Sequence, residues 1–371
     1  MKALLLSAGS SIHTARWANG LSRAGVDICL ATQHPVSQEL DPGVDVIQFP
    51  HRGNPGYVMM AAQLRRVTRV MRPDILNVHF ASGYGTTGRL INWHPYLLSV
   101  WGSDVFSFPE RSPLHRRLVA GNLKAADVVA STSRCMADQV RTLVPAIGDI
   151  PITPFGIDVE SFSSVPAISG EPRDTVVIGT VKAMEDVYGI DTLIEAFRVL
   201  YEKLVADGDP LANRIELRLI GGGSRTDALR HLAERLEMRD RITFVGQVPH
   251  ANVPKEIEQI DIFVALSRQE SFGVAVLEAG AAGRPVVVSD AGGLAEVVRH
   301  GITGIVVPRE APVAAADALL ELLRNPEKQL AMAAAAKRHV RDLYAWDTCV
   351  KRMLAAYDST LRACKDQCRR S

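Results

Sequence analysis

Residues 262–279 read IFVALSRQESFGVAVLEA, and this stretch decides the fold. Its apolar start indicates a buried strand, Phe272-Gly273 indicates a turn, and the apolar run from Val274 indicates a helix. A strand that passes directly into a helix is the repeating unit of doubly wound parallel sheets. We therefore expect an α/β protein.

The same alternation of strand and helix continues along the whole chain. Short apolar runs bounded by Gly, Asp or Pro are typical of parallel strands that are covered on both faces. In the first half we expect strands at 2–7, 26–31, 45–49, 74–79, 97–101, 127–131 and 150–153. In the second half we expect them at 175–180, 215–220, 241–245, 261–265, 285–289 and 304–307.

The length of 371 residues suits two domains of about 150 residues each or slightly more. Segment 154–172 is rich in Pro, Ser and Gly and has no helical period, which indicates a linker. We place the first domain at 1–160 and the second at 161–344. Apolar periodicity predicts a helix over 343–366, and the end of the chain, 345–371, is expected to pack back on the first domain.

The composition narrows the class of protein further. With 47% hydrophobic residues, 22% charged residues and a net charge of +1, the chain is neither disordered nor a globally basic nucleic-acid binder. Its five cysteines form no C-x-x-C pair, so neither a disulfide framework nor a common zinc cluster is indicated. No apolar run has the length of a signal peptide core or a membrane span, and we expect a cytoplasmic protein.

Two carboxylates flank the turn in the opening stretch. Glu270 lies in the loop, and Glu278 lies about one turn into the helix. The free N–H groups at the helix start near Gly273 suit an anion. Carboxylates beside such a site suggest that the ligand is a sugar nucleotide. The carboxylates would accept hydrogen bonds from its hydroxyl groups, and the backbone amides would bind its diphosphate. On spacing alone, a capped helix with two solvated glutamates is the favoured alternative.

This spacing resembles the Glu-x(7)-Glu signature of the retaining glycosyltransferases of family four. That family has the GT-B fold, in which two Rossmann-like domains face a central cleft and the second holds most of the nucleotide sugar. Further segments resemble the family in the same order, at 154–158 with Phe162, 179–182 with 188–197, 219–223, 244–248, and 291–296 with 301–304. The resemblance covers nearly the whole chain.

The resemblance implies roles in the second domain. Glu270 would contact the transferred sugar, Glu278 the ribose hydroxyls and Lys182 the diphosphate. The other expected donor-binding residues are Gly179, Gln247, Val248, Ser271, Phe272 and Gly273. Where the family commonly has two basic residues, this chain has Thr180 and Tyr188, so Arg268 is expected to supply the missing charge.

In the first domain, the expected acceptor or phosphate contacts follow strands. They are Ser10, Ser11, His13, His79 and Asp104. Hydroxyls and amides at a helix start can bind a phosphate. A purely structural role is an equal alternative for His13 and His79. Trp101 stands where many relatives have a histidine, so no catalytic role is carried over to it.

The resemblance implies a metal-independent, retaining transfer of a hexose-type sugar from a nucleotide diphosphate sugar. The acceptor would be a hydroxyl of a glycan or glycolipid precursor. We expect no cofactor and no metal, and interpret Asp207-Gly208-Asp209 as a solvated turn. The alternatives are a nucleotide-sugar epimerase of the same fold and a non-catalytic nucleotide-sugar-binding protein.

A basic helix is expected at 57–72. It carries four arginines and no acidic residue. Such a face can dock on anionic lipid, and Arg111, Arg116, Arg117 and Lys124 add a second basic stretch. This leaves open a peripheral location on the inner face of the membrane. An ordinary helix with a core face and a solvent face is the favoured alternative.

Overall fold

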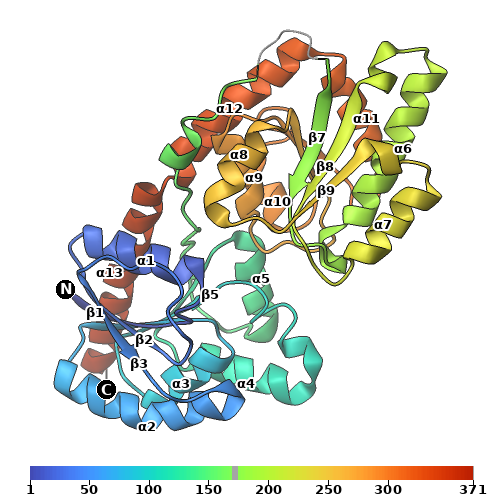
Figure 1. Cartoon of the computed structure of the whole chain (residues 1–371). Coiled ribbons are helices and arrows are strands. Elements are labelled where there is room, and N and C mark those ends of the chain that lie inside the picture. Colours follow the sequence, from blue (N-terminus) through green and yellow to red (C-terminus); the bar gives the residue numbers. More distant parts are fainter. Residues whose placement is uncertain (169–173, 371) are drawn as a thin grey trace. The chain divides into compact units, whose positions relative to one another are not determined.

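The computed structural model describes residues 1–168 and 174–370 (Figure 1). The chain divides into two compact units. The first runs from Met1 to Gly156 and includes the residues from Trp346 onward, and the second is Ile157–Ala345. The expected domain boundary after residue 160 falls slightly later than this division. Residues 169–172 of the expected linker lie outside the described residues.

The first unit is built on a six-stranded parallel sheet with the order β3-β2-β1-β4-β5-β6. Its strands are β1 (Lys2–Leu6), β2 (Asp27–Thr32), β3 (Val44–Gln48), β4 (Ile75–His79), β5 (Tyr96–Val100) and β6 (Val128–Ser131). Its helices are α1 (Ile12–Arg23), α2 (Gly53–Met71), α3 (Gly83–Ile91), α4 (Pro113–Lys124), α5 (Arg134–Leu143) and α13 (Trp346–Arg370). Helices α1 and α13 lie on one face of the sheet, and α2, α3 and α4 lie on the other.

The second unit repeats this plan with the order β12-β11-β10-β7-β8-β9. Its strands are β7 (Val176–Val181), β8 (Ile215–Ile220), β9 (Ile242–Gly246), β10 (Ile262–Ala265), β11 (Val286–Ser289) and β12 (Ile305–Val307). Its helices are α6 (Ile190–Ala206), α7 (Thr226–Arg235), α8 (Val253–Glu258), α9 (Val274–Ala281), α10 (Gly293–Val297), α11 (Pro312–Leu323) and α12 (Pro326–Tyr344). The predicted pair of doubly wound parallel sheets is confirmed.

The central strands of both sheets are the most deeply buried, whereas the edge strands β3 and β9 are more exposed. Strands β4, β5, β10 and β11 are buried at every residue, as their continuous apolar runs predict. Neighbouring strands pair in parallel, for example Ala3 with Ile28 and Ile75. In each sheet the strand order reverses next to its first strand, between β1 and β4 and between β7 and β10. Ligands of open α/β sheets bind at the carboxyl ends of strands at such a point.

The predicted strand at 150–153 is wrong. Only an isolated bridge forms there, between Ser131 and Ile152. Pro151 accepts a hydrogen bond from the Ser131 N–H at 3.0 Å but has no N–H of its own to extend a ladder.

The predicted helix at 343–366 is interrupted. Helix α12 ends at Tyr344, Ala345 is extended with φ −59° and ψ 145°, and α13 begins at Trp346. The Ile157 N–H donates to the Tyr344 carbonyl oxygen at 2.7 Å, which removes that acceptor from any continuing helix. Helix α12 therefore belongs to the second unit and α13 to the first.

Helix α13 completes the first unit. It packs on α1, β5 and β6. The rings of Trp346 and Trp17 meet edge to face at 5.1 Å, and Asn77 Nδ2 on β4 donates to the buried Tyr357 hydroxyl at 3.0 Å. No helix in the described ranges is both long and apolar enough to cross a membrane.

Candidate functional site

The expected catalytic residues of the second unit lie where its strand order reverses. Lys182 follows β7, and the loop with Glu270 follows β10. These two strands are paired neighbours, with Ile262 opposite Ile178. Because the carboxyl ends of parallel strands lie at the same edge of the sheet, the two side chains meet there.

Lys182 and Glu270 form a partly buried ion pair. The Lys182 Nζ donates to Glu270 Oε2, and the two side chains are 15% and 10% exposed. The Ser267 hydroxyl approaches the same carboxylate oxygen at 3.5 Å. The Lys182 ammonium also lies 4.4 Å from the centre of the Tyr188 ring, which is a cation–π contact. A cation and a carboxylate are therefore held together at the expected donor site.

The second carboxylate, Glu278, is more deeply buried. Its side chain on α9 is 5% exposed. The His250 Nε2 lies 2.9 Å from Glu278 Oε1, and this ring is 39% exposed. His250 begins a short turn that follows β9. Glu278 is thus not a solvated glutamate on a helix surface, because its carboxylate is enclosed and hydrogen-bonded.

The loop between Glu270 and α9 is shaped by close backbone contacts. Gly273 has a φ of 106°, a left-handed value that favours glycine, and directly precedes α9. A Cβ on Gly293 would lie 2.5 Å from the backbone of Phe272, so only glycine permits this approach. The Phe272 ring is buried, with its centre 5.9 Å from that of Tyr344. The donor-binding roles of Ser271, Phe272 and Gly273 stay predictions.

The remaining expected donor contacts lie on β7 and after β9. Gly179 is buried in β7, where a Cβ would lie 2.8 Å from Ile260. Gln247 is exposed and Val248 is half-buried directly after β9. The Gly221 N–H donates to the Gly246 carbonyl at 2.8 Å. The contacts of Gly179, Gln247 and Val248 with a donor stay predictions.

The Arg268 guanidinium is paired with two acidic side chains. Its two Nη atoms donate to Asp191 Oδ1 and Oδ2 at 3.0 and 2.7 Å, and its Nε donates to Glu310 at 3.0 Å. The hydrogen bond to Asp191 raises the pKa of Arg268. Burial raises the pKa of Asp191. The hydrogen bonds from Arg268 and the Thr192 backbone lower it, and together they outweigh the effect of burial, so the net shift of the pKa is downward. Bidentate pairing of this kind fixes the loop before Glu270, and the expected contact of Arg268 with a diphosphate would have to compete with it.

The first unit places a buried histidine at the reversal between β1 and β4. His79 ends β4, and its Nδ1 lies 2.9 Å from the Ser7 hydroxyl, which in turn lies 2.7 Å from Thr14 Oγ1. Burial lowers the pKa of His79 to about 3, so the ring is neutral. Its ring centre lies 4.2 Å from that of Trp101. These contacts give His79 a structural role, and acceptor contact stays a prediction.

Asp104 holds a loop. Its carboxylate accepts backbone N–H groups from Ala81 at 2.7 Å, Gly102 at 2.8 Å and Trp101 at 3.2 Å. Burial raises the pKa of Asp104, and these hydrogen bonds oppose the shift. Both carboxylate oxygens are therefore engaged in the fold, and a contact of Asp104 with an acceptor stays a prediction.

The other expected residues of the first unit surround the start of α1. Ser10 is exposed, and Ser11 precedes α1 without a side-chain capping bond. The His13 ring stacks on Phe155 with their centres 4.0 Å apart. Ser10, Ser11 and His13 therefore lie at the carboxyl end of β1, where a ligand of this sheet is expected.

The acidic turn at 207–209 has a structural role. Arg324 Nη2 lies 2.7 Å from Asp207 and 3.2 Å from Asp209. In the part of the chain that the structure describes, no three His, Cys, Asp or Glu side chains are grouped as metal ligands.

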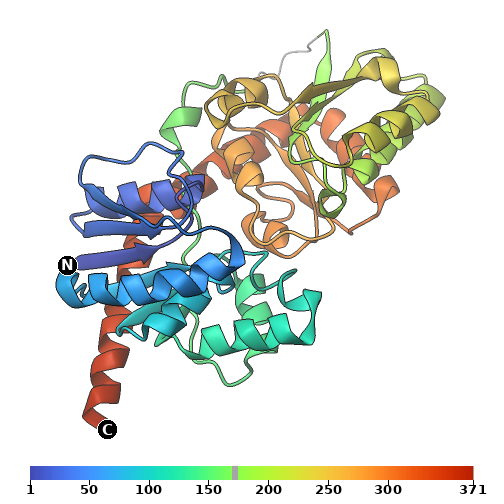
Figure 2. The same cartoon turned by 60° about the horizontal axis from the view of Figure 1, so that its bottom comes forward.

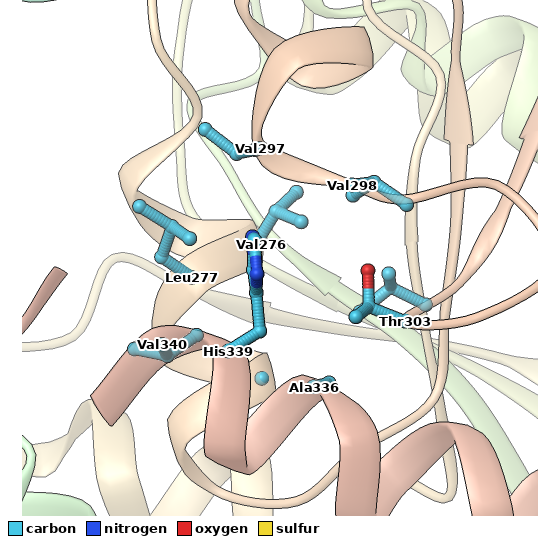
Figure 3. A pocket seen from close by; sticks show the side chains of 10 residues that line it. Val276, Leu277, Val297, Val298, Thr303, Ala336, His339 and Val340 are labelled. Carbon is cyan, nitrogen blue, oxygen red and sulfur yellow. The ribbon is translucent and has the colours of Figure 1, made fainter. Parts of the chain in front are cut away.

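A small cavity lies behind α9, between α9, α12 and the segment around Thr303 (Figure 3). Its volume of about 10 Å³ leaves room for one water molecule. His339 of α12 points into it. Burial, together with the charge of Arg299, lowers the pKa of His339, so the ring is neutral. This cavity is too small for a nucleotide sugar.

Two family models match the chain. The model described as "Glycosyl transferases group 1" matches residues 162–339, and the one described as "Glycosyl transferase 4-like" matches residues 2–133. Together they cover most of both units. The chain belongs to the glycosyltransferases of family four. The predicted family is confirmed.

The similarity between this family four glycosyltransferase and its relatives covers different shares of the relatives' length. The GDP-mannose-dependent alpha-(1-6)-phosphatidylinositol monomannoside mannosyltransferase of Mycobacterium tuberculosis is 30% identical over 249 residues, which cover 64% of this chain and 63% of the relative. The match thus spans less than two thirds of that relative. The D-inositol 3-phosphate glycosyltransferase of Actinosynnema mirum is 29% identical over 94% of this chain and 91% of its own length.

Solved structures share the fold of this family four member. The sucrose-phosphate synthase of Thermosynechococcus elongatus has a TM-score of 0.83 at 20% identity. The similarity covers 98% of this chain and 100% of that one. It supports the GT-B fold.

The structure adds contacts that the family motifs did not reveal. Ser267 joins the ion pair, His250 holds Glu278, and Asp191 with Glu310 holds Arg268. These partners come from separate loops. The only sequence signal for His250 was its place shortly after β9, two positions beyond the expected donor-binding residue Val248.

Proposed function

We propose that this protein is a metal-independent, retaining glycosyltransferase. It moves a hexose-type sugar from a nucleotide diphosphate sugar to a hydroxyl group of a glycan or glycolipid precursor. The observation that carries the proposal is the Lys182–Glu270 ion pair at the reversal point of the second sheet. Membership of family four supports the reaction class.

The ion pair suits a donor that carries both a diphosphate and sugar hydroxyls. In the free protein the Lys182 and Glu270 charges neutralise each other. When the donor binds, Lys182 turns to the diphosphate and Glu270 accepts hydrogen bonds from the sugar. Lys182 then stabilises the negative charge that develops on the departing diphosphate.

The reaction retains the configuration of the anomeric carbon. The acceptor hydroxyl attacks from the face that the diphosphate leaves. The bond from the anomeric carbon to the acceptor oxygen forms as the bond to the phosphate oxygen breaks. The acceptor proton passes to the departing phosphate oxygen, which leaves a nucleoside diphosphate. The reaction needs no other acid, base or oxidant for its atoms and electrons to balance.

The relatives support the substrate classes. The name of the mycobacterial relative states a GDP-mannose donor and a phosphatidylinositol monomannoside acceptor. The name of the Actinosynnema mirum relative includes D-inositol 3-phosphate. We propose a nucleotide sugar donor and a hydroxyl acceptor here as well. An epimerase would use the same donor but release an altered sugar without any acceptor, and a non-catalytic protein would bind the donor unchanged.

The test starts with nucleotide binding. UDP, GDP, ADP, CMP and dTDP, and common nucleotide sugars, are screened for a rise in the thermal unfolding midpoint, with and without EDTA. A ligand that binds only the native state raises this midpoint. We expect a shift with one base that EDTA does not change. A folded protein that responds to none of them would contradict the donor site.

Transfer is then measured with Glu270→Gln and Lys182→Met, using the donor that the screen identifies. We expect each to lower the transfer rate by about 100-fold or more. The matched control is Glu256→Gln, because Glu256 forms a comparable ion pair with Arg218 at 2.7 Å elsewhere in the same unit. Full transfer by both site variants would remove the ion pair from the mechanism. Donor turnover to an altered free sugar would favour the epimerase.

We also propose that the first unit contacts an anionic membrane through the exposed face of α2 and α4. Val70 of α2 is 88% exposed and Leu114 of α4 is 73% exposed. Helix α3 packs against both helices, so the three lie side by side (Figure 2). The same two segments carry exposed arginines, namely Arg65, Arg66, Arg69, Arg72, Arg116 and Arg117. Interleaved basic and apolar side chains suit an anionic lipid surface.

A further inference from the structure

We propose that His250 is a positioning residue that sets the preference of the donor site for ribose over 2′-deoxyribose, through Glu278. This inference rests on the proposed function, because it assumes that Glu278 contacts the ribose of the donor. It assigns to His250 a role in substrate selection that acts through its neighbour rather than by contact with the reacting atoms.

The first step is the state of the Glu278 carboxylate. It is 5% exposed, and burying a carboxylate is costly unless the carboxylate is hydrogen-bonded. The His250 Nε2 lies 2.9 Å from Oε1. An ionised carboxylate only accepts hydrogen bonds, so Nε2 carries the proton of this contact. His250 therefore supplies a hydrogen-bond donor to Glu278 Oε1.

The second step is orientation. With Oε1 held by His250, rotation of the carboxylate about its last bond is restricted. The direction of Oε2 is then fixed before any ligand arrives. A carboxylate in a fixed direction discriminates strongly between a ligand with a hydroxyl group and one without it, because the missing partner leaves a buried acceptor unpaired. In a nucleotide, the 2′-hydroxyl is such a group.

The third step is where the two residues come from. His250 lies in the turn after β9, at the edge of the sheet, whereas Glu278 lies on α9, which follows β10. Strands β7 and β8 lie between β9 and β10 in the sheet. The hydrogen bond therefore ties the loop that carries the expected donor contacts Gln247 and Val248 to the carboxylate expected to meet the ribose. Two parts of the expected donor site are joined through one contact.

The experiment measures dissociation constants by calorimetry for wild type and variants. The probes are UDP, GDP, ADP and CDP, each compared with its 2′-deoxy counterpart. We expect wild type to prefer the ribose form of its nucleotide. His250→Ala should lower this preference about tenfold, and Glu278→Gln should lower it as much or more. His250→Gln should restore much of it, because its amide Nε2 can donate from a similar position.

Steady-state kinetics separates positioning from catalysis. His250→Ala should raise the donor KM more than it lowers kcat. The matched control is His231→Ala, since His231 is an exposed histidine 3.4 Å from Glu234 on α7 of the same unit. This control should change neither the KM nor the ribose preference.

The outcomes are distinguishable. If wild type binds no nucleotide, the proposed function fails and this inference fails with it. If wild type binds and Glu278→Gln loses the ribose preference while His250→Ala keeps it, the inference alone is overturned. Equal loss of preference in His250→Ala and His250→Gln, with a lower unfolding midpoint in both, would assign His250 a structural role and also overturn it.

Discussion

Lys182 owes its position to an aromatic ring as well as to a carboxylate. Its ammonium pairs with Glu270 and lies 4.4 Å from the centre of the Tyr188 ring. The family resemblance led us to expect a second basic residue at the position of Tyr188. A ring face attracts the ammonium without adding a second positive charge beside it. Tyr188 thus offers a different way to hold one cation in place.

Two substitutions of Tyr188 distinguish the contribution of its ring from that of its hydroxyl group. Tyr188→Phe keeps the ring and should leave transfer within about twofold of wild type, whereas Tyr188→Leu should raise the donor KM about fivefold. Initial-rate kinetics checks both values. Tyr201→Leu is the matched control, because Arg241 lies 4.7 Å from the Tyr201 ring, and it should leave the donor KM unchanged. A similar defect in Tyr188→Phe would show that the hydroxyl, not the ring face, matters.

Single residues were predictable where a motif lies within one stretch of chain. Glu270 and Glu278 are eight positions apart, and a strand, turn and helix bring them to one end of the sheet. Their partners were not predictable in this way. His250 reaches Glu278 from a different loop, 28 positions away. Such a contact depends on the relative placement of two βα units, which local periodicity does not encode.

At the scale of elements, the loop between β10 and α9 is fixed at its start by Arg268. The guanidinium reaches Asp191 in the first turn of α6 and Glu310 after β12. The Arg268 N–H donates to the Val187 carbonyl at 2.8 Å. A Cβ on Gly189 would lie 2.0 Å from the Leu266 carbonyl oxygen, so glycine is required there. These contacts join the loop to the start of α6.

A double-mutant cycle tests whether Arg268 positions this loop. Arg268→Gln and Asp191→Asn should each lower the free energy of unfolding, with a coupling of about 1 kcal/mol, since both side chains are partly exposed. Both should lower the transfer rate to a similar degree. If Arg268 contacts the diphosphate instead, Arg268→Gln should reduce transfer far more than Asp191→Asn.

The pH dependence of this pair has a defined sign. The pKa of Asp191 is lower in the folded protein than in the unfolded chain. The stabilisation is therefore fully present above the unfolded pKa of about 3.9 and is lost as the pH falls through the folded pKa. The coupling between Arg268 and Asp191 should accordingly be constant near neutral pH and shrink only in strong acid.

Strands were predictable from the sequence where an apolar run is bounded by residues typical of turns. The runs at 97–101 and 285–289 correspond to β5 and β11. The expected strand at 150–153 failed because its pairing depends on a proline without an N–H. The expected helix across Ala345 failed because Ile157, far away in sequence, binds the Tyr344 carbonyl. The first failure has a signal in the sequence, the proline itself, whereas the second comes from a backbone hydrogen bond that side-chain patterns do not reveal.

For the molecule as a whole, the exposed face of α2 and α4 predicts binding to anionic lipid. The protein should sediment with vesicles that contain roughly 30% phosphatidylglycerol and not with pure phosphatidylcholine vesicles. Replacing Arg66, Arg69 and Arg117 with Gln should weaken binding about a hundredfold, and raised salt should weaken it too.

The control for vesicle binding is a second triple variant that changes the net charge by the same amount as the first. Arg230, Arg235 and Arg239 are exposed on the second unit, and replacing them with Gln should leave vesicle binding unchanged. Equal loss in both triple variants would mean that only net charge matters. Binding to neither vesicle type would contradict the membrane proposal and leave the transferase proposal intact.

Helix α13 also affects the order in which the protein can form during synthesis. Asn77 and its buried partner Tyr357 are 280 positions apart, and everything between Ile157 and Ala345 belongs to the other unit. A ribosome therefore makes all of the second unit before the helix that covers β5 and β6. The first unit, although it is begun first, keeps this part of its sheet uncovered until α13 has been made.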